Sequence, residues 1–117
     1  MPGLVFFQTA ARERVVTFYT DRLGFEPWLE QAAGCTILRR DNLLLGFCGA
    51  DQSETEGTVT VAVADETAVD ALYGDLEDVA DGPPTTNNAF DIYQFFATDP
   101  DGRTVEVQTF RHPVPSV

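Results

Sequence analysis

Few residues of this chain are suited to nucleophilic or acid–base catalysis. The single histidine, His112, stands between Arg111 and Pro113 in a proline-rich tail. Every Ser-His-Asp or Cys-His arrangement would have to use this one residue, which follows the last predicted strand. The sequence therefore gives no support for a hydrolase with a nucleophilic triad.

The cysteines, Cys35 and Cys48, lack the C-x-x-C spacing of redox and zinc sites. They could pair with one another, but a cytosolic compartment keeps thiols reduced. We expect two reduced cysteines that act as small, buried apolar residues.

Glu106 is the carboxylate with the clearest chemical alternatives. It either faces a ligand, where it pairs with a cationic group or serves as a general base, or it is a strand residue neutralised by Arg39 or Arg40. One of the two arginines, beside a predicted hairpin turn, is expected to be solvated. A lone carboxylate does not make an enzyme, so a catalytic role needs further groups.

The acidity of the chain excludes some classes of partner. Nineteen acidic residues stand against seven arginines and no lysine, which gives a net charge of -12. Nucleic acid is a poor partner for such a surface, and no apolar run approaches the roughly 20 residues that span a bilayer. The charge either attracts a cationic ligand or keeps the protein soluble in a salt-rich cytoplasm. We favour the second interpretation, and with it a halophilic, cytoplasmic protein.

The 117 residues are enough for one domain with one core. Apolar periodicity changes between a period of two and a period of three to four, which predicts strands and helices in alternation. Thr9 is the expected N-cap of the first helix and Gly24 its C′ glycine, whereas Asp65 caps the second. The predicted strands are Leu4–Phe7, Glu26–Gln31, Cys35–Arg39, Leu43–Cys48, Thr58–Ala64, Asp91–Thr98 and Thr104–Phe110, and the helices are Ala11–Leu23 and Asp65–Leu76.

The order of elements restarts after an acidic linker. A shift of 54 places Leu4-Val5 on Thr58-Val59, and a shift of 60 places Leu45-Gly46-Phe47 on Val105-Glu106-Val107, by the numbering of the sequence. This weak internal repeat predicts two modules. We divide the chain into module 1 (about 3–49), a solvated linker (50–57), module 2 (about 58–111) with a turn-rich loop at Asp81–Asn88, and a tail (112–117).

Two motifs point to a known family. Phe18–Phe25 (FYTDRLGF) and Phe95–Glu106 (FFATDPDGRTVE) resemble the vicinal oxygen chelate superfamily, which includes glyoxalase I, bleomycin-resistance proteins and extradiol dioxygenases. The resemblance covers nearly the whole chain. It implies an α+β fold of two βαβββ modules whose curved mixed sheets enclose a cleft, commonly in a homodimer. Function has to be argued from the site, because this fold carries many activities.

The resemblance also implies where a metal would bind. The matching positions are Leu4, Gly46, Thr58 and Glu106, of which only Glu106 is a strong donor. A divalent ion needs three or four N, O or S donors. Repair would need Gln8, Gln94, a partner's carboxylate or His112 folding in from the tail. We therefore expect no cofactor, and a metal at Glu106 only if such a site exists.

Strand alternation selects the residues expected to line the cleft. If Glu106 faces the cleft, Val105 and Val107 face the helix layer. Trp28 is either a stacking wall or ordinary packing. The predicted cleft residues are Phe6, Gln8, Trp28, Gln94, Phe96, Glu106, Gln108 and Phe110.

Three functions remain open. A metal-independent protein of the bleomycin-resistance type, which sequesters a small molecule in an aromatic-lined cleft without reacting with it, is favoured. The alternative is a metal-assisted lyase, isomerase or dioxygenase that uses Glu106 and non-standard donors. A third is a relic that only dimerises. The expected partners are a small-molecule ligand and a second copy of the chain, not nucleic acid or a membrane.

Overall fold

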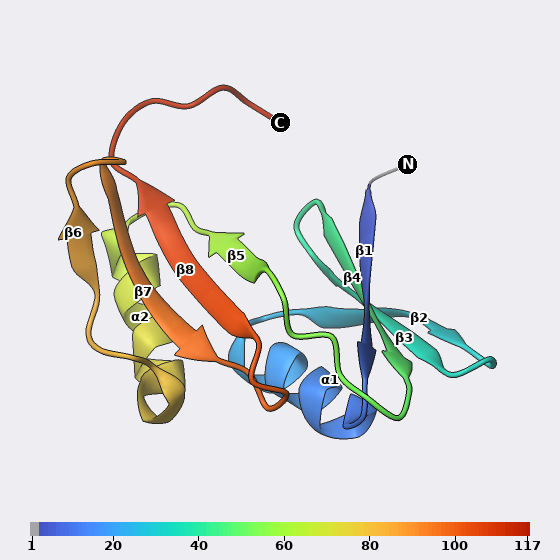
Figure 1. Cartoon of the computed structure of the whole chain (residues 1–117). Coiled ribbons are helices and arrows are strands. Elements are labelled where there is room, and N and C mark those ends of the chain that lie inside the picture. The colour runs from blue at the N-terminus through green and yellow to red at the C-terminus, as the bar shows by residue number, and fades with distance from the viewer. Residues whose placement is uncertain (1–2) are drawn as a thin grey trace. The chain divides into compact units, whose positions relative to one another are not determined.

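The computed structural model describes residues 3–117 and contains two four-stranded mixed sheets, each with one α-helix of 11 residues (Figure 1). Residues 3–56 and 99–103 form one compact unit, and residues 57–98 and 104–117 form the other. The predicted α+β class with two βαβββ modules is confirmed. Within residues 3–117, neither helix is long and apolar enough to cross a membrane.

The first unit contains one helix on a four-stranded sheet. Its sheet has the order β1-β4-β3-β2, in which β1 runs parallel to β4 and the other neighbours are antiparallel. The helix packs on β3 and β4. The elements are β1 (Leu4–Thr9), α1 (Arg12–Arg22), β2 (Glu26–Gln31), β3 (Cys35–Arg40) and β4 (Leu43–Gly49).

At the two ends of α1, the prediction for the C-terminus is confirmed and the prediction for the N-cap is not. Gly24 has a φ of +75°, the conformation expected of a C′ glycine after the helix. The prediction of Thr9 as N-cap was wrong, because Ala11 occupies that position. Thr9 Oγ1 instead accepts a 3.0 Å hydrogen bond from the Ala11 amide, in a turn that precedes the helix.

The second unit repeats the arrangement. Its sheet has the order β5-β8-β7-β6, with β5 parallel to β8, and α2 packs on β7 and β8. The Asp65 side chain accepts a hydrogen bond from the Ala68 amide, which confirms it as the N-cap of α2. The elements are β5 (Thr58–Ala62), α2 (Glu66–Leu76), the 3-10 helix η1 (Glu77–Val79), β6 (Thr85–Asn87), β7 (Ile92–Thr98) and β8 (Thr104–Phe110).

Strand β6 corrects the prediction of a loop at Asp81–Asn88. Thr85, Thr86 and Asn87 pair with the first residues of β7 and complete the sheet at its edge. This strand follows Pro83 and Pro84 and has only three residues, so it leaves no periodic apolar signal.

The acidic linker is hydrogen-bonded to the end of β1. Gln8 and Glu54 exchange two hydrogen bonds: the Gln8 amide donates to Glu54 Oε1 (2.7 Å) and the Glu54 amide donates to the Gln8 carbonyl (2.9 Å). Ser53 Oγ accepts from the Ala10 amide at 2.9 Å. The linker is therefore fastened to the end of β1, although most of its side chains are exposed.

Arg103, in the turn between β7 and β8, is buried in the first unit. The Arg103 side chain is 0% exposed and lies 4.4 Å from the ring centre of Phe7 and 5.4 Å from that of Phe47. Its guanidinium also donates to the Glu54 carbonyl and to Asp99 Oδ2. Gly102, in the turn between β7 and β8, takes a φ of +91°, a conformation that glycine adopts without steric cost.

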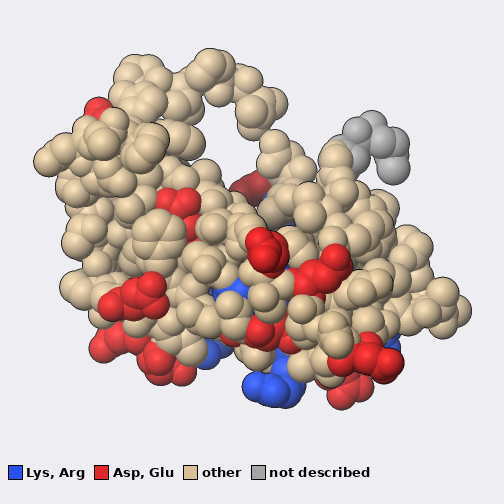
Figure 2. All heavy atoms as spheres, in the orientation of Figure 1, with Lys and Arg blue, Asp and Glu red and all other residues tan. Residues whose placement is uncertain are grey.

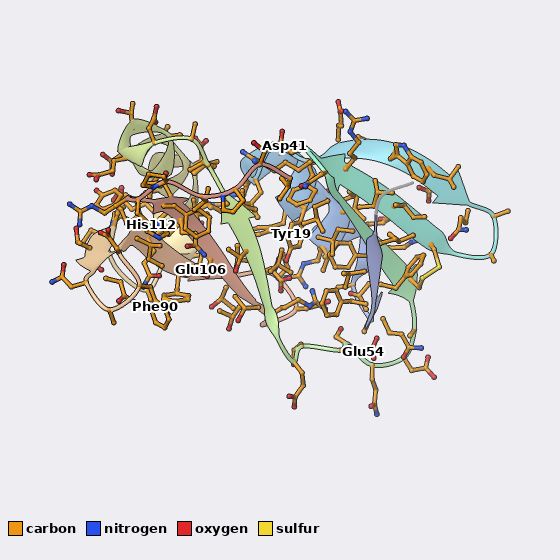
Figure 3. All side chains as sticks on the ribbon, turned by 90° about the horizontal axis from the view of Figure 1, so that it is seen from above. Tyr19, Asp41, Glu54, Phe90, Glu106 and His112 are labelled. Carbon is orange, nitrogen blue, oxygen red and sulfur yellow. A yellow bond between two sulfur atoms is a disulfide. The ribbon has the colours of Figure 1, made fainter. Side chains whose placement is uncertain are left out.

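Cys35 and Cys48 form a disulfide, so the expectation of two reduced thiols was wrong for this structure (Figure 3). They are directly opposite one another in the antiparallel pair β3–β4. The expectation of reduced thiols depended on the compartment alone. The register of β3 and β4 brings the two cysteine side chains together, as a disulfide requires.

Acidic side chains occur in several separate groups on the face shown in Figure 2, with few basic ones. They belong to the general surface of the chain. The proposed adaptation to salt stays a prediction.

Candidate functional site

The candidate site is a pocket of about 520 Å³ in the second unit, on the sheet face away from α2. Its size is within the range of pockets that enclose small molecules. The residues that line it are Asn87, Phe90, Ile92, Gln94, Phe96, Glu106, Gln108, Phe110 and His112.

Alternation along β8 divides core residues from pocket residues. Val105 and Val107 are fully buried on the α2 side, and Glu106 and Gln108 face the pocket. Because the strand is half apolar and half polar, this orientation could be predicted from the sequence. Phe110 continues the pocket face at the end of the strand.

Cross-strand register sets the neighbours within the pocket. Phe96 of β7 is directly opposite Glu106, and Gln94 is opposite Gln108. Each pair places a side chain from both strands on the same face. The pocket floor therefore combines an aromatic ring, a carboxylate and two amides.

Two neutral donors hold the Glu106 carboxylate. Thr60 Oγ1 donates to Glu106 Oε1 at 2.9 Å, and Gln108 Nε2 donates to the same oxygen at 3.2 Å. Arg40 of the first unit donates to the Leu23 carbonyl (2.9 Å) and pairs with Asp41 (3.3 Å). Neutralisation of Glu106 by Arg39 or Arg40 stays a prediction.

Two aromatic residues that the sequence did not assign to the site also line it. Phe90 is 70% exposed, and the His112 ring packs edge-on against Phe110 with 5.7 Å between ring centres (Figure 3). Both are in irregular segments, outside the strand alternation that identified the others. The position of His112 two residues after Phe110 was the one feature of the sequence that could have placed it beside the pocket.

Solved structures of low sequence identity share this architecture. An integron cassette protein from the Halifax Harbour sewage outfall metagenome has a TM-score of 0.79 at 20% identity, over 94% of this chain and 98% of that one. A glyoxalase/bleomycin resistance protein/dioxygenase from Nocardioides has a TM-score of 0.74 at 16% identity, over 100% and 88%. Lactoylglutathione lyase from Agrobacterium tumefaciens has a TM-score of 0.76 at 16% identity, over 95% and 94%.

The chain has the glyoxalase/bleomycin-resistance/dioxygenase fold. No protein-family model and no curated protein matches its sequence. Because this fold carries many activities, the function of the chain has to be inferred from the side chains of its own pocket.

The three other predicted cleft residues belong to the first unit of this glyoxalase-like fold. Phe6 is on β1 opposite Gly46, and Gln8 is fastened through its backbone to Glu54. Trp28 lies at an irregularity of β2 and is 43% exposed. The second unit therefore forms its pocket from five of the eight predicted residues, without these three.

The residues at the metal positions of this glyoxalase-like fold do not fit a metal ion. A Cβ atom on Gly46 would lie 2.4 Å from Cδ1 of Phe6, so the phenyl ring occupies the space that a ligand at position 46 would need. In the second unit the strand register places Thr60, and not the predicted Thr58, opposite Glu106, and the side chains of Thr60 and Glu106 are joined by a hydrogen bond. Across residues 3–117, no three or more His, Cys, Asp or Glu side chains come together in a metal-binding group.

Proposed function

We propose that this protein is a metal-independent member of the glyoxalase/bleomycin-resistance/dioxygenase superfamily that binds and sequesters a small, flat molecule. The observation that carries the proposal is the pocket of about 520 Å³ in the second unit, with three phenylalanines around one carboxylate. Phenyl faces stack on planar ligands, and a few fixed polar groups orient them.

The composition of the pocket favours binding over turnover. Among the lining residues of the pocket, only Glu106 and His112 have ionisable side chains. A metal-assisted reaction requires several donors on one ion, whereas the equivalent positions here contribute the single carboxylate of Glu106. Sequestration needs shape, stacking and hydrogen bonding, which this set of side chains supplies.

The test uses N-phenyl-1-naphthylamine, a neutral aromatic probe whose fluorescence rises in apolar surroundings. We expect saturable binding that Phe110→Ala weakens at least about fivefold, because a stacking wall is lost. Phe6→Ala is the matched control, since Phe6 and Phe110 are 46% and 44% exposed but only Phe110 lines the pocket. Phe90→Ala, in an exposed loop, gives a second variant if Phe110→Ala does not fold.

Equal loss of probe binding in Phe6→Ala and Phe110→Ala would contradict a site in the second unit alone. Metal dependence is measured in the same assay, with EDTA or with added Zn²⁺, Ni²⁺, Mn²⁺ or Fe²⁺. Affinity is expected to stay within about twofold, since one carboxylate holds a divalent ion weakly. Stoichiometric metal in the purified protein that disappears in Glu106→Ala would favour the metal-assisted enzyme instead.

A further inference from the structure

The two oxygens of Glu106 are in different situations. Among the described residues, the two side-chain donors to this carboxylate, Thr60 and Gln108, both approach Oε1. A carboxylate has about four acceptor positions on its two oxygens. Oε2 therefore remains to accept a hydrogen bond from a molecule in the pocket.

The orientation of Gln108 supplies a second acceptor beside the first. Its Nε2 donates to Glu106, so its carbonyl oxygen is at the other end of the amide. Glu106 and Gln108 are two positions apart on β8 and share the pocket face. The polar floor thus offers two neighbouring acceptors, one of which is charged.

The walls select for a flat molecule. Phe90, Phe96 and Phe110 contribute phenyl rings, and Glu106 is the one acidic side chain among the lining residues. Anionic ligands are disfavoured beside a carboxylate whose side-chain partners, Thr60 and Gln108, are neutral. A ligand has to combine a planar apolar body with an edge of N–H donors.

We infer that the pocket recognises an amidine-type cation: a planar group with two parallel N–H donors, attached to or part of an aromatic ring. Glu106 Oε2 and the Gln108 carbonyl oxygen each accept one N–H, and the hydrogen bond to the Glu106 carboxylate is charge-assisted. The phenylalanines stack on the ring. This inference rests on the proposed function, because it names the ligand class of the same pocket.

The test compares four single-ring probes of similar size by calorimetry. Benzamidine presents two N–H donors and a positive charge, benzylamine a charge without the planar pair, benzamide a neutral planar group, and benzoate an anion. We expect benzamidine to bind at least about tenfold more tightly than benzamide, because a charge-assisted hydrogen bond is lost in the neutral compound. Benzylamine falls between them, and benzoate binds most weakly.

Two variants assign the acceptors. Glu106→Gln is expected to weaken benzamidine binding at least about tenfold and benzamide binding by no more than about twofold, since the variant removes the charge but keeps one acceptor oxygen. Gln108→Leu removes the second acceptor and weakens benzamidine at least about threefold. Gln31→Leu is the control, because Gln31 is an exposed residue of β2 in the first unit.

The outcomes separate this inference from the proposed function. If N-phenyl-1-naphthylamine binds but benzamidine binds no better than benzamide, the amidine inference is wrong and the binding function stands. Unchanged benzamidine affinity in Glu106→Gln has the same meaning. If neither aromatic probe binds, both proposals fail.

Discussion

The hydroxyl group of Tyr19 donates a 2.8 Å hydrogen bond to Oδ2 of Asp99, although 80 positions separate the two residues. Arg103 Nη1 donates to the same oxygen at 2.7 Å, and the amides of Asp101 and Arg103 donate to Oδ1 at 2.9 and 3.0 Å. The buried carboxylate therefore has four donors. Burial and the negative charge of Asp99 raise the pKa of Tyr19, which keeps its hydroxyl group protonated as a donor.

Tyr19→Phe tests that hydrogen bond. The free energy of unfolding should fall by about 1–3 kcal/mol, because Asp99 loses a donor in a site that water does not reach. Tyr73→Phe is the matched control, since the Tyr73 ring packs edge-on against Phe95. Urea unfolding in about 1 M salt, where charge repulsion is screened, gives both values. Equal stability of the two variants would contradict an energetic role for the Tyr19 hydroxyl group.

Arg103 and Asp99 should depend on each other. Arg103→Met leaves the Asp99 carboxylate buried without its cation and is expected to cost about 3–5 kcal/mol. Adding Asp99→Asn removes the stranded charge, so the double variant should be more stable than Arg103→Met alone. A double-mutant cycle from urea unfolding measures the coupling free energy. If Arg103→Met does not fold, its soluble fraction is compared with that of the double variant, which should be higher. Strictly additive losses would show that the two charges act independently.

Ionisation of Tyr93 makes the stability of the protein depend on pH in the alkaline range. Its hydroxyl group donates a 2.6 Å hydrogen bond to Asp70, and this bond, with some loss of hydration, raises the pKa of Tyr93 from 10.0 to about 12. The stabilisation is complete below pH 10 and is lost as pH rises toward 12, because the unfolded chain ionises first. Ultraviolet titration should show this late ionisation, and Asp70→Asn should move it to lower pH. An unchanged titration in Asp70→Asn would remove Asp70 as the cause.

Gly46→Ala tests the close approach of Phe6. The new methyl group would lie 2.4 and 2.5 Å from ring carbons of Phe6, so we expect a loss of about 1–3 kcal/mol from overpacking. Phe6→Ala in the same chain should relieve most of the clash. Gly74→Ala in α2 is the control, because an added Cβ would meet no atom within 4 Å apart from its chain neighbours and the backbone of its own helix, and helix propensity favours alanine by about 1 kcal/mol.

The disulfide predicts that native protein contains no thiol that reacts with a thiol reagent before reduction, since both cysteines of the chain are paired. The Cys35→Ser/Cys48→Ser double variant should be less stable than the oxidised protein by about 2–3 kcal/mol, as for a closed loop of this order of length. Intact mass and urea unfolding check both points. Two free thiols in protein purified without reductant would restore the earlier expectation of reduced cysteines.

The sequence predicted those features that depend on local pattern. Alternation of valines with Glu106 and Gln108 identified the two faces of β8, and Gly24 and Asp65 marked helix ends by known backbone chemistry. The internal repeat predicted the two modules. Each of these signals is contained within a few residues or in a fixed shift along the chain.

Features that depend on contacts between residues far apart in the sequence could not be predicted from local patterns. Strand register decides that Cys35 meets Cys48, and tertiary packing brings the Asp99–Arg103 turn to Tyr19. Strand β6 is recognisable only by its partner β7. His112 follows the last strand, where no periodicity shows which way a side chain points.

The Asp99–Arg103 turn has a consequence for any attempt to separate the two repeats. Although the chain reads as two consecutive copies joined at 50–57, the first compact unit includes this turn from within the second copy. Cutting the gene at the junction would remove from the first fragment the arginine that fills the space between Phe7 and Phe47. We therefore expect a fragment that ends at this junction to be less stable than the first unit of the intact chain.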